Sequence, residues 1–147
     1  MKLNPRRLML NNVVSYELTL ESDDELLEVI DDAADSFRRV IVGNGYYTTG
    51  PIVFRALPGS QEFTIMTTLG NKVNLVDDSD TGFRFQEHVH VATDYFYRHF
   101  DVEEPVPYAE IEAAVSEAGS RVESVYHVIL DFYGEPVLDL YVEAEMQ

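Results

Sequence analysis

The chain contains no cysteine and no tryptophan, and it has no long apolar run. Without cysteine, its 147 residues can form no disulfide, no thiolate metal site and no cysteine nucleophile. No segment approaches the ~18 apolar residues that a membrane-spanning helix needs. The basic start at residues 1–7 is not followed by the apolar stretch of a signal peptide. These absences lead us to expect a cytoplasmic protein that does not enter a membrane.

Basic residues are scarce as well. Ten Lys and Arg stand against 27 Asp and Glu, which gives a net charge of −17. A cut after Asp78 leaves seven basic and twelve acidic residues (−5) before it, and three basic and fifteen acidic residues (−12) after it. Such a surface repels phosphate backbones, so we expect no direct nucleic-acid binding. It attracts cationic ligands or basic proteins, although a charge of this size also serves solubility alone.

The first half of the sequence reads as a strand, a helix and a hairpin. Residues 9–20 alternate between apolar and polar positions, as a strand does. Ser22 and Glu25 have the spacing of a capping box, and a helical pattern of apolar residues follows as far as Ile41. Two strand-like segments then flank the turn signal Pro58–Gln61.

The second half repeats this order. An extended stretch covers residues 83–100, with a break expected near Ala92–Asp94. Pro105 and Pro107 precede a shorter helix that Gly119 ends, and a closing hairpin turns at residues 134–136.

These patterns predict an α+β fold with an internal duplication. The first pseudo-repeat covers residues 1–76, the second covers residues 83–147, and an acidic linker joins them. Together they form a single two-lobed domain over residues 1–147. Each strand-helix-strand-strand unit contributes to a mostly antiparallel curved sheet that carries two helices on one face.

Side-chain alternation divides the predicted sheet into two faces. The helices are expected to cover one set of residues: Val14, Tyr16, Leu18, Ile52, Phe54, Phe63, Ile65, Phe96, Phe100, Val128, Leu130, Phe132, Leu138, Leu140 and Val142. The opposite face then carries Ser15, Glu17, Arg55, Glu62, Thr64, Met66, Tyr97, His99, His127, Asp131, Tyr133, Asp139, Tyr141 and Glu143. Because this second set is rich in tyrosine and carboxylates, we take it as the candidate site.

Three further segments are residues 45–51 (GYYTTGP), 95–100 (YFYRHF) and 137–143 (VLDLYVE). They resemble the gyrase-inhibitor-like small-molecule-binding family, whose fold also forms the effector-binding part of several multidrug-sensing transcription regulators. The resemblance implies a cleft between the two repeats, where aromatic rings and an acidic residue hold hydrophobic, often cationic, molecules. By position, Tyr97, Tyr141 and either Glu143 or Asp139 match those roles. The chain departs from the family in lacking tryptophan, and the two repeats leave no room for a helix-turn-helix module.

The ligand-binding residues predicted from the face and from the resemblance are Tyr97, Tyr141, Glu143, Asp139, Glu62, Met66, Tyr133 and His127. Tyrosine rings and carboxylates together can hold a cation, and a desolvated cation–π contact contributes about 2 kcal/mol. The alternative is that these tyrosines only complete an open sheet face and direct their hydroxyls to water.

Signals for metals, cofactors and catalysis are weak. His88 and His90 are two residues apart, but no third ligand accompanies them, and the acidic residues at 77–80 lack the spacing of a calcium loop. We therefore predict no metal and no cofactor. The chain has no nucleophile elbow, P-loop or dinucleotide fingerprint, which favours a non-enzymatic role. A hydrolase that uses Glu62, Asp139 or Glu143 as a general base is a minor alternative.

Two kinds of function remain open from the sequence. The first is a stand-alone protein that binds a hydrophobic or cationic small molecule. The second is an acidic adaptor, inhibitor or chaperone-like module that binds a basic protein. Exposed strand edges in each lobe are also compatible with a homodimer.

Overall fold

The computed structural model describes residues 1–19, 26–70, 82–100, 104–132 and 134–147. Six strands and two helices lie in these residues: β1 (Asn4–Thr19), α1 (Leu26–Gly43), β2 (Val53–Ala56), β3 (Glu62–Thr68), β4 (Arg84–His99), α2 (Tyr108–Glu117), β5 (Ser120–Phe132) and β6 (Glu135–Met146). The predicted Ser22–Glu25 capping box, nearly all of the acidic linker and the predicted site residue Tyr133 lie outside the described residues.

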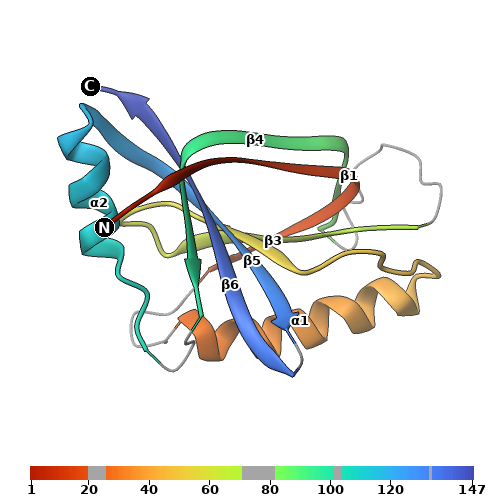
Figure 1. The fold of residues 1–147 in the computed structure, drawn as a ribbon. Helices are drawn as coiled ribbons and strands as arrows, with labels where there is room; N and C mark the ends of the chain where they lie inside the picture. Colours follow the sequence, from red (N-terminus) through yellow and green to blue (C-terminus); the bar gives the residue numbers. More distant parts are fainter. Residues whose placement is uncertain (20–25, 71–81, 101–103, 133) are drawn as a thin grey trace.

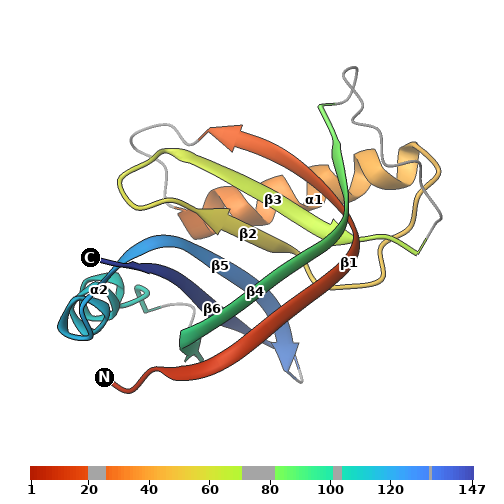
Figure 2. The same ribbon diagram turned by 90° about the horizontal axis from the view of Figure 1, so that it is seen from above.

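The strands close into a barrel in the order β1-β3-β2-β5-β6-β4, and the neighbours pair antiparallel throughout (Figures 1 and 2). The predicted α+β class and the mostly antiparallel sheet are therefore confirmed. The sheet does more than curve, because β4 pairs with β6 at one side and with β1 at the other. Closure gives every strand two neighbours, but in the described part of the chain residues 4–11 of β1 are paired with β4 alone, so a strand edge remains there and the homodimer remains a prediction.

Each half of the chain follows the predicted order. The first half runs β1-α1-β2-β3 and the second runs β4-α2-β5-β6. Order alone does not establish that one half copies the other, so the internal duplication stays a prediction. The expected break near Ala92–Asp94 corresponds to an irregular register, since Arg6 pairs with Thr93 but Asn4 pairs with Phe96. The strand continues through this point and bends there (Figure 1).

Both helices lie on the outside of the barrel (Figures 1 and 2). Helix α1 buries Ala34, Phe37 and Ile41 against a cluster that includes Val14 and Ile65. Helix α2 buries Ile111 and Val115 against side chains of β5 and β6. In α1 the described end of the predicted apolar pattern (Ala34, Phe37 and Ile41) is buried as expected. Helix α2 ends as predicted, because Gly119 follows it with a φ of +83°, a conformation that glycine adopts without strain.

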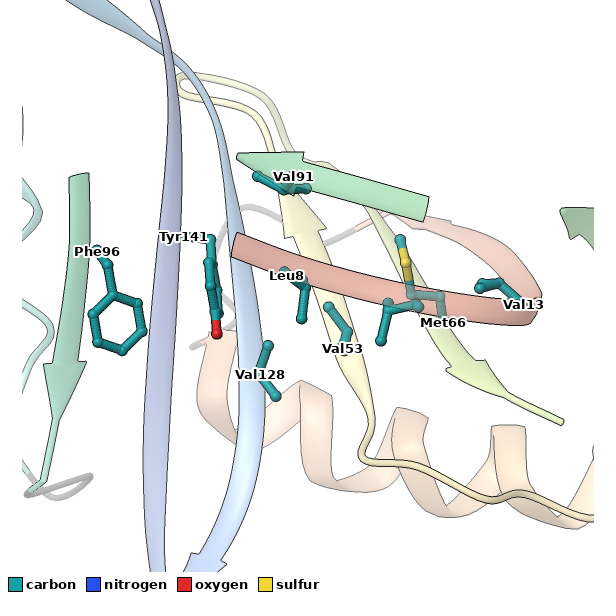
Figure 3. Close-up of a cluster of buried hydrophobic side chains, with 9 residues drawn as sticks. Leu8, Val13, Val53, Met66, Val91, Phe96, Val128 and Tyr141 are labelled. Atoms are coloured by element: carbon teal, nitrogen blue, oxygen red, sulfur yellow. The ribbon is translucent and has the colours of Figure 1, made fainter. Parts of the chain in front are cut away.

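The inner face of the barrel is also apolar. Its core contains Leu8, Leu10, Val13, Val53, Met66, Val91, Phe96, Val128 and Tyr141 (Figure 3). Phe96, Val128 and Leu130 were predicted to lie under the helices, and that prediction is wrong because they point inward or pack against the inner core. Phe100, which was also assigned to the covered face, is 71% exposed.

Asn12 lies where β1 changes the face that its side chains present. Leu8 and Leu10 point inward before it and Val13 points inward after it, so a step of three residues replaces the usual step of two. Asn12 has a φ of +56°, and its Nδ2 donates to the carbonyl oxygen of Leu69 at 2.8 Å. Asparagine adopts this left-handed conformation more readily than residues other than glycine.

Replacing Asn12 with valine is therefore expected to lower the free energy of unfolding by about 2 kcal/mol, because a β-branched residue is strained at positive φ and the bond to Leu69 is lost. Asn12→Gly also loses that bond but accepts the backbone conformation, so we expect it to cost less than half as much. Urea denaturation of the two variants measures both values. Equal losses would contradict the role given to the backbone conformation.

Candidate functional site

Strand register identifies the side chains that share the inner face. One row crosses all six strands as Phe96, Tyr141, Tyr126, Arg55, Thr64 and Glu17. A second row contains Arg98, Asp139, Val128, Val53, Met66, Ser15 and Arg84. Because residues directly paired across strands point to the same face, the two rows place apolar, aromatic and charged side chains next to one another inside the barrel.

A cavity of about 620 Å³ lies beside these two rows and is lined by several of their residues. It is lined by Ser15, Glu17, Arg55, Thr64, Met66, Arg84, Phe85, Gln86, His88, Val89, His90 and Tyr126. The lining comes from β1, β2, β3, β4 and β5, and therefore from both halves of the chain. Two arginines and one glutamate lie in the lining, so its formal charge is +1 with neutral histidines, in a protein whose net charge is −17.

An ion pair with one buried partner lies further along the inner face: Asp139 is buried, and the Arg98 side chain is 28% exposed. Asp139 is only 2% exposed, and its two carboxylate oxygens accept from Arg98 Nε at 2.6 Å and Nη2 at 2.8 Å. The hydrogen bond to Asp139 raises the pKa of Arg98, although burial opposes it. The Arg98 guanidinium also lies 5.8 Å from the centre of the Phe96 ring. Because both oxygens of Asp139 accept from this arginine, the arrangement does not favour Asp139 as a general base.

Glu143 and Arg55 form a looser arrangement beside the cavity. Glu143 Oε1 accepts a hydrogen bond from Ser124 Oγ at 2.6 Å, and Arg55 Nε lies 4.0 Å from the same oxygen. The guanidinium of Arg55 lies over the ring of Tyr126, with 5.7 Å between the guanidinium carbon and the ring centre. Burial, and then the charge of Glu143, raise the pKa of Tyr126. Its hydroxyl therefore stays protonated at neutral pH.

Four of the predicted site residues lie on the inner face: Tyr141, Asp139, Glu143 and Met66. Of these, Met66 lines the cavity. Tyr141 is 5% exposed and packs edge-on against Phe96 at 5.0 Å between ring centres (Figure 3). Burial raises the pKa of Tyr141. Glu62 is exposed at the start of β3 and does not line the cavity.

Tyr97 and His127 do not lie on the predicted face. Tyr97 packs against the cluster under α2, and its pairing partner Leu140 belongs to that cluster. His127 of β5 also pairs with Leu140, on the opposite edge of β6 from Tyr97, so it points to the same face as these two residues. The prediction failed because residues 95–99 of β4 and 124–128 of β5 are buried or half-buried on both faces, so apolar residues such as Phe96 and Val128 do not reveal which side faces the helix.

His127 instead belongs to a polar contact beneath α2. Its ring stacks on Phe54 with 4.3 Å between centres, its Nδ1 lies 3.3 Å from the Phe54 carbonyl oxygen, and its Nε2 lies 2.6 Å from the hydroxyl of Tyr108. A neutral ring that donates from Nδ1 and accepts at Nε2 satisfies both partners. Burial lowers the pKa of His127 to about 4 and raises the pKa of Tyr108 to about 12.

Several lining residues were not selected from the sequence. Tyr126 and Arg84 were missed altogether, while Arg55 was assigned to the face taken as the candidate site but not to the predicted ligand-binding residues. The signal that identifies them is cross-strand register, which places Arg55 between Thr64 and Tyr126. Within the described residues, no group of three or more His, Asp or Glu side chains is arranged to hold a metal ion. Neither described helix has the length and apolar character needed to cross a membrane.

Comparison by sequence finds neither a matching family model nor a matching curated protein. Solved structures do match. The C-terminal domain of EcmrR aligns with a TM-score of 0.60 and 10% identity over 100% of both chains. SAV2435 bound to tetraphenylphosphonium aligns with a TM-score of 0.53 and 11% identity over 99% of this chain and 94% of SAV2435. The chain shares their fold.

EcmrR in its complex with DNA aligns with a TM-score of 0.67 and 12% identity. That match covers 98% of this chain, which spans 58% of the EcmrR chain. These neighbours have the gyrase-inhibitor-like effector-binding fold, so the resemblance drawn from the sequence is confirmed for the fold.

Proposed function

We propose that this protein binds a small organic molecule in the cavity of its inner face. The observation that carries the proposal is the cavity itself, which measures about 620 Å³ and is lined from five strands. Small-molecule sites typically occupy about 300–1,000 Å³ and combine apolar walls with a few polar groups. The bound tetraphenylphosphonium in SAV2435, which has the same fold, supports the proposal.

The walls are mostly polar and carry a smaller apolar part, so they suit a compact aromatic ligand with polar groups. Met66 and Val89 offer apolar surface, and the Tyr126 ring offers a flat face. Ser15 and Thr64 add hydroxyls that can donate or accept. A ligand of this kind would bridge the two halves of the chain, because β1, β2 and β3 of the lining come from the first half and β4 and β5 come from the second.

A hydrophobic or cationic ligand was predicted from the sequence. In the described residues, the carboxylates nearest the cavity already have partners: Glu17 pairs with Arg84 at 3.4 Å, and Glu143 accepts from Ser124. A bound cation would have to compete with these groups or approach beside them. The cationic preference therefore stays a prediction, and the experiment below includes it.

Binding of a basic protein remains the alternative proposal. It is favoured by exposed acidic side chains on α2 and at the start of β5: Glu110, Glu112, Glu117 and Glu123. A basic partner that co-purifies at low salt and is released at high salt would support this role. A protein that stays free under those conditions would count against it.

Small-molecule binding can be tested with three aromatic probes of different charge. They are N-phenyl-1-naphthylamine (neutral), 8-anilinonaphthalene-1-sulfonate (anionic) and tetraphenylphosphonium (cationic). We expect at least one probe to bind at a 1:1 ratio, as measured by fluorescence titration or calorimetry. Thr64→Trp fills the cavity and should weaken that binding about tenfold or more, because the bulky ring occupies the space between Arg55 and Glu17.

Glu62→Trp is the matched control, since Glu62 lies on the same strand but outside the lining. It is expected to leave binding within about twofold of the unmodified protein, a change of about 0.4 kcal/mol. If none of the three probes binds, or if Thr64→Trp binds as well as the unmodified protein does, the cavity is not the binding site.

A further inference from the structure

The inner face carries one polar atom that its surroundings do not satisfy. Arg55 Nε is buried and has no hydrogen-bond partner, and it is the one such side-chain atom found within the described residues. Its nearest charged neighbour, Glu143 Oε1, lies 4.0 Å away, which is too far for a hydrogen bond. That oxygen already accepts from Ser124 Oγ. A buried donor without an acceptor is costly, and such groups in native proteins call for an explanation.

The other inner-face arginines differ from Arg55. Arg98 donates from two nitrogens to Asp139, and Arg84 lies 3.4 Å from Glu17 at an exposed position. Arg55 is half-buried in the middle of its row, where its neighbours across the strands are Thr64 and Tyr126. The side chain is 34% exposed although Nε itself is buried, so the exposed part of Arg55 offers its positive charge to the cavity that it lines.

The surroundings of Arg55 indicate what kind of acceptor fits. A guanidinium binds oxyanions well because its parallel N–H groups match the two oxygens of a carboxylate or sulfonate. The lining has a formal charge of +1, since Arg55 and Arg84 outnumber Glu17. Tyr126 and Met66 next to these charges favour an aromatic or apolar body attached to the anion.

We propose that the cavity binds aromatic oxyanions, and that an anionic oxygen of the ligand pairs with the exposed part of the Arg55 guanidinium, whose Nε the neighbouring side chains leave unsatisfied. The proposal rests on the proposed small-molecule function and specifies its ligand class. Glu143 acts against such a ligand, because its carboxylate lies 4.0 Å from the same nitrogen. Arg55 therefore favours an anionic ligand, and Glu143 disfavours one.

The test compares two probes that share one aromatic skeleton. 8-Anilinonaphthalene-1-sulfonate differs from N-phenyl-1-naphthylamine by its sulfonate, so the ratio of their dissociation constants isolates the contribution of the anion. Arg55→Gln should weaken the sulfonate probe about tenfold or more and leave the neutral probe within about twofold. Glu143→Gln should strengthen binding of the sulfonate probe several-fold, which a variant that merely damages the fold would not do.

Arg121→Gln is the control for a change of net charge, because Arg121 forms an exposed pair with Glu145 and does not line the cavity. It should leave both probes unaffected. The proposal is overturned if Arg55→Gln leaves the sulfonate affinity unchanged, or if the unmodified protein binds tetraphenylphosphonium more tightly than the sulfonate. In either case, binding of any probe that Thr64→Trp abolishes would still support the small-molecule function, so the two failures are distinguishable.

Discussion

Replacing Arg98 with methionine is expected to lower the free energy of unfolding by about 2–3 kcal/mol, because it removes two charged donors from the buried carboxylate of Asp139, although Arg98 itself is 28% exposed. The side chain of Asp139 is 3% exposed, and both of its oxygens accept from Arg98. Methionine keeps the apolar stem beside Phe96 but leaves the carboxylate without those two donors. Urea denaturation monitored by tyrosine fluorescence measures the loss.

Two controls separate the effect of burial from the effect of losing a cation. Arg121→Met removes the exposed pair with Glu145, so it should cost less than about 1 kcal/mol. The double variant Arg98→Met with Asp139→Leu removes the buried carboxylate together with its partner and should recover most of the lost stability. If Arg121→Met and Arg98→Met cost the same, or if the double variant is as unstable as the single one, the interpretation of Asp139 as an uncompensated buried charge is wrong.

Acidification from pH 7 to pH 4 is expected to remove about 3 kcal/mol of stability through His127 alone. Burial lowers the pKa of His127 from 6.5 to about 4 in the folded protein. Above pH 6.5 the ring is neutral in both states and the pKa shift has no effect on stability. Between pH 6.5 and 4 the unfolded chain takes up a proton that the folded protein excludes, so the free energy of unfolding falls. Below pH 4 both states bind the proton and the loss levels off.

The unfolding free energy at a series of pH values tests this expectation, and a variant isolates the histidine. Glutamine at position 127 can donate to the Phe54 carbonyl and accept from Tyr108, but it does not titrate. His127→Gln should therefore flatten the profile between pH 6.5 and 4. His88→Gln alters an exposed histidine and should keep the steep profile. A profile that His127→Gln leaves as steep as before would contradict the buried neutral histidine.

Local patterns predicted the helices well because each helix has one buried stripe. Ala34, Phe37 and Ile41 recur at helical spacing and are buried as expected, and Ile111 and Val115 do the same in α2. The fold class followed from the order of these elements. Closure of the sheet did not, because it depends on pairing between β1 and β4 over a long sequence separation.

Strand faces were harder to predict, since alternation is informative only where one face is solvated. At the end of β4, residues 95–99 are buried or half-buried on both faces, so Phe96 and Tyr97 could each have been the inward residue. The apolar residues were assigned to the helices, and this choice moved Tyr97 and His127 to the wrong side. The balance of charges at the site could not be predicted from the sequence either, because Ser124, Glu143 and Arg55 meet only through the pairing of three strands.

The pairing of β1 has a consequence for biosynthesis. Residues 4–11 pair with β4, whereas residues 13–19 pair with β3. While the ribosome has made only the first half of the protein, the leading segment of β1 has no partner, and its backbone groups can pair with another nascent chain. Crowded polysomes and slow translation before residue 84 are therefore the conditions under which this protein is most prone to aggregate.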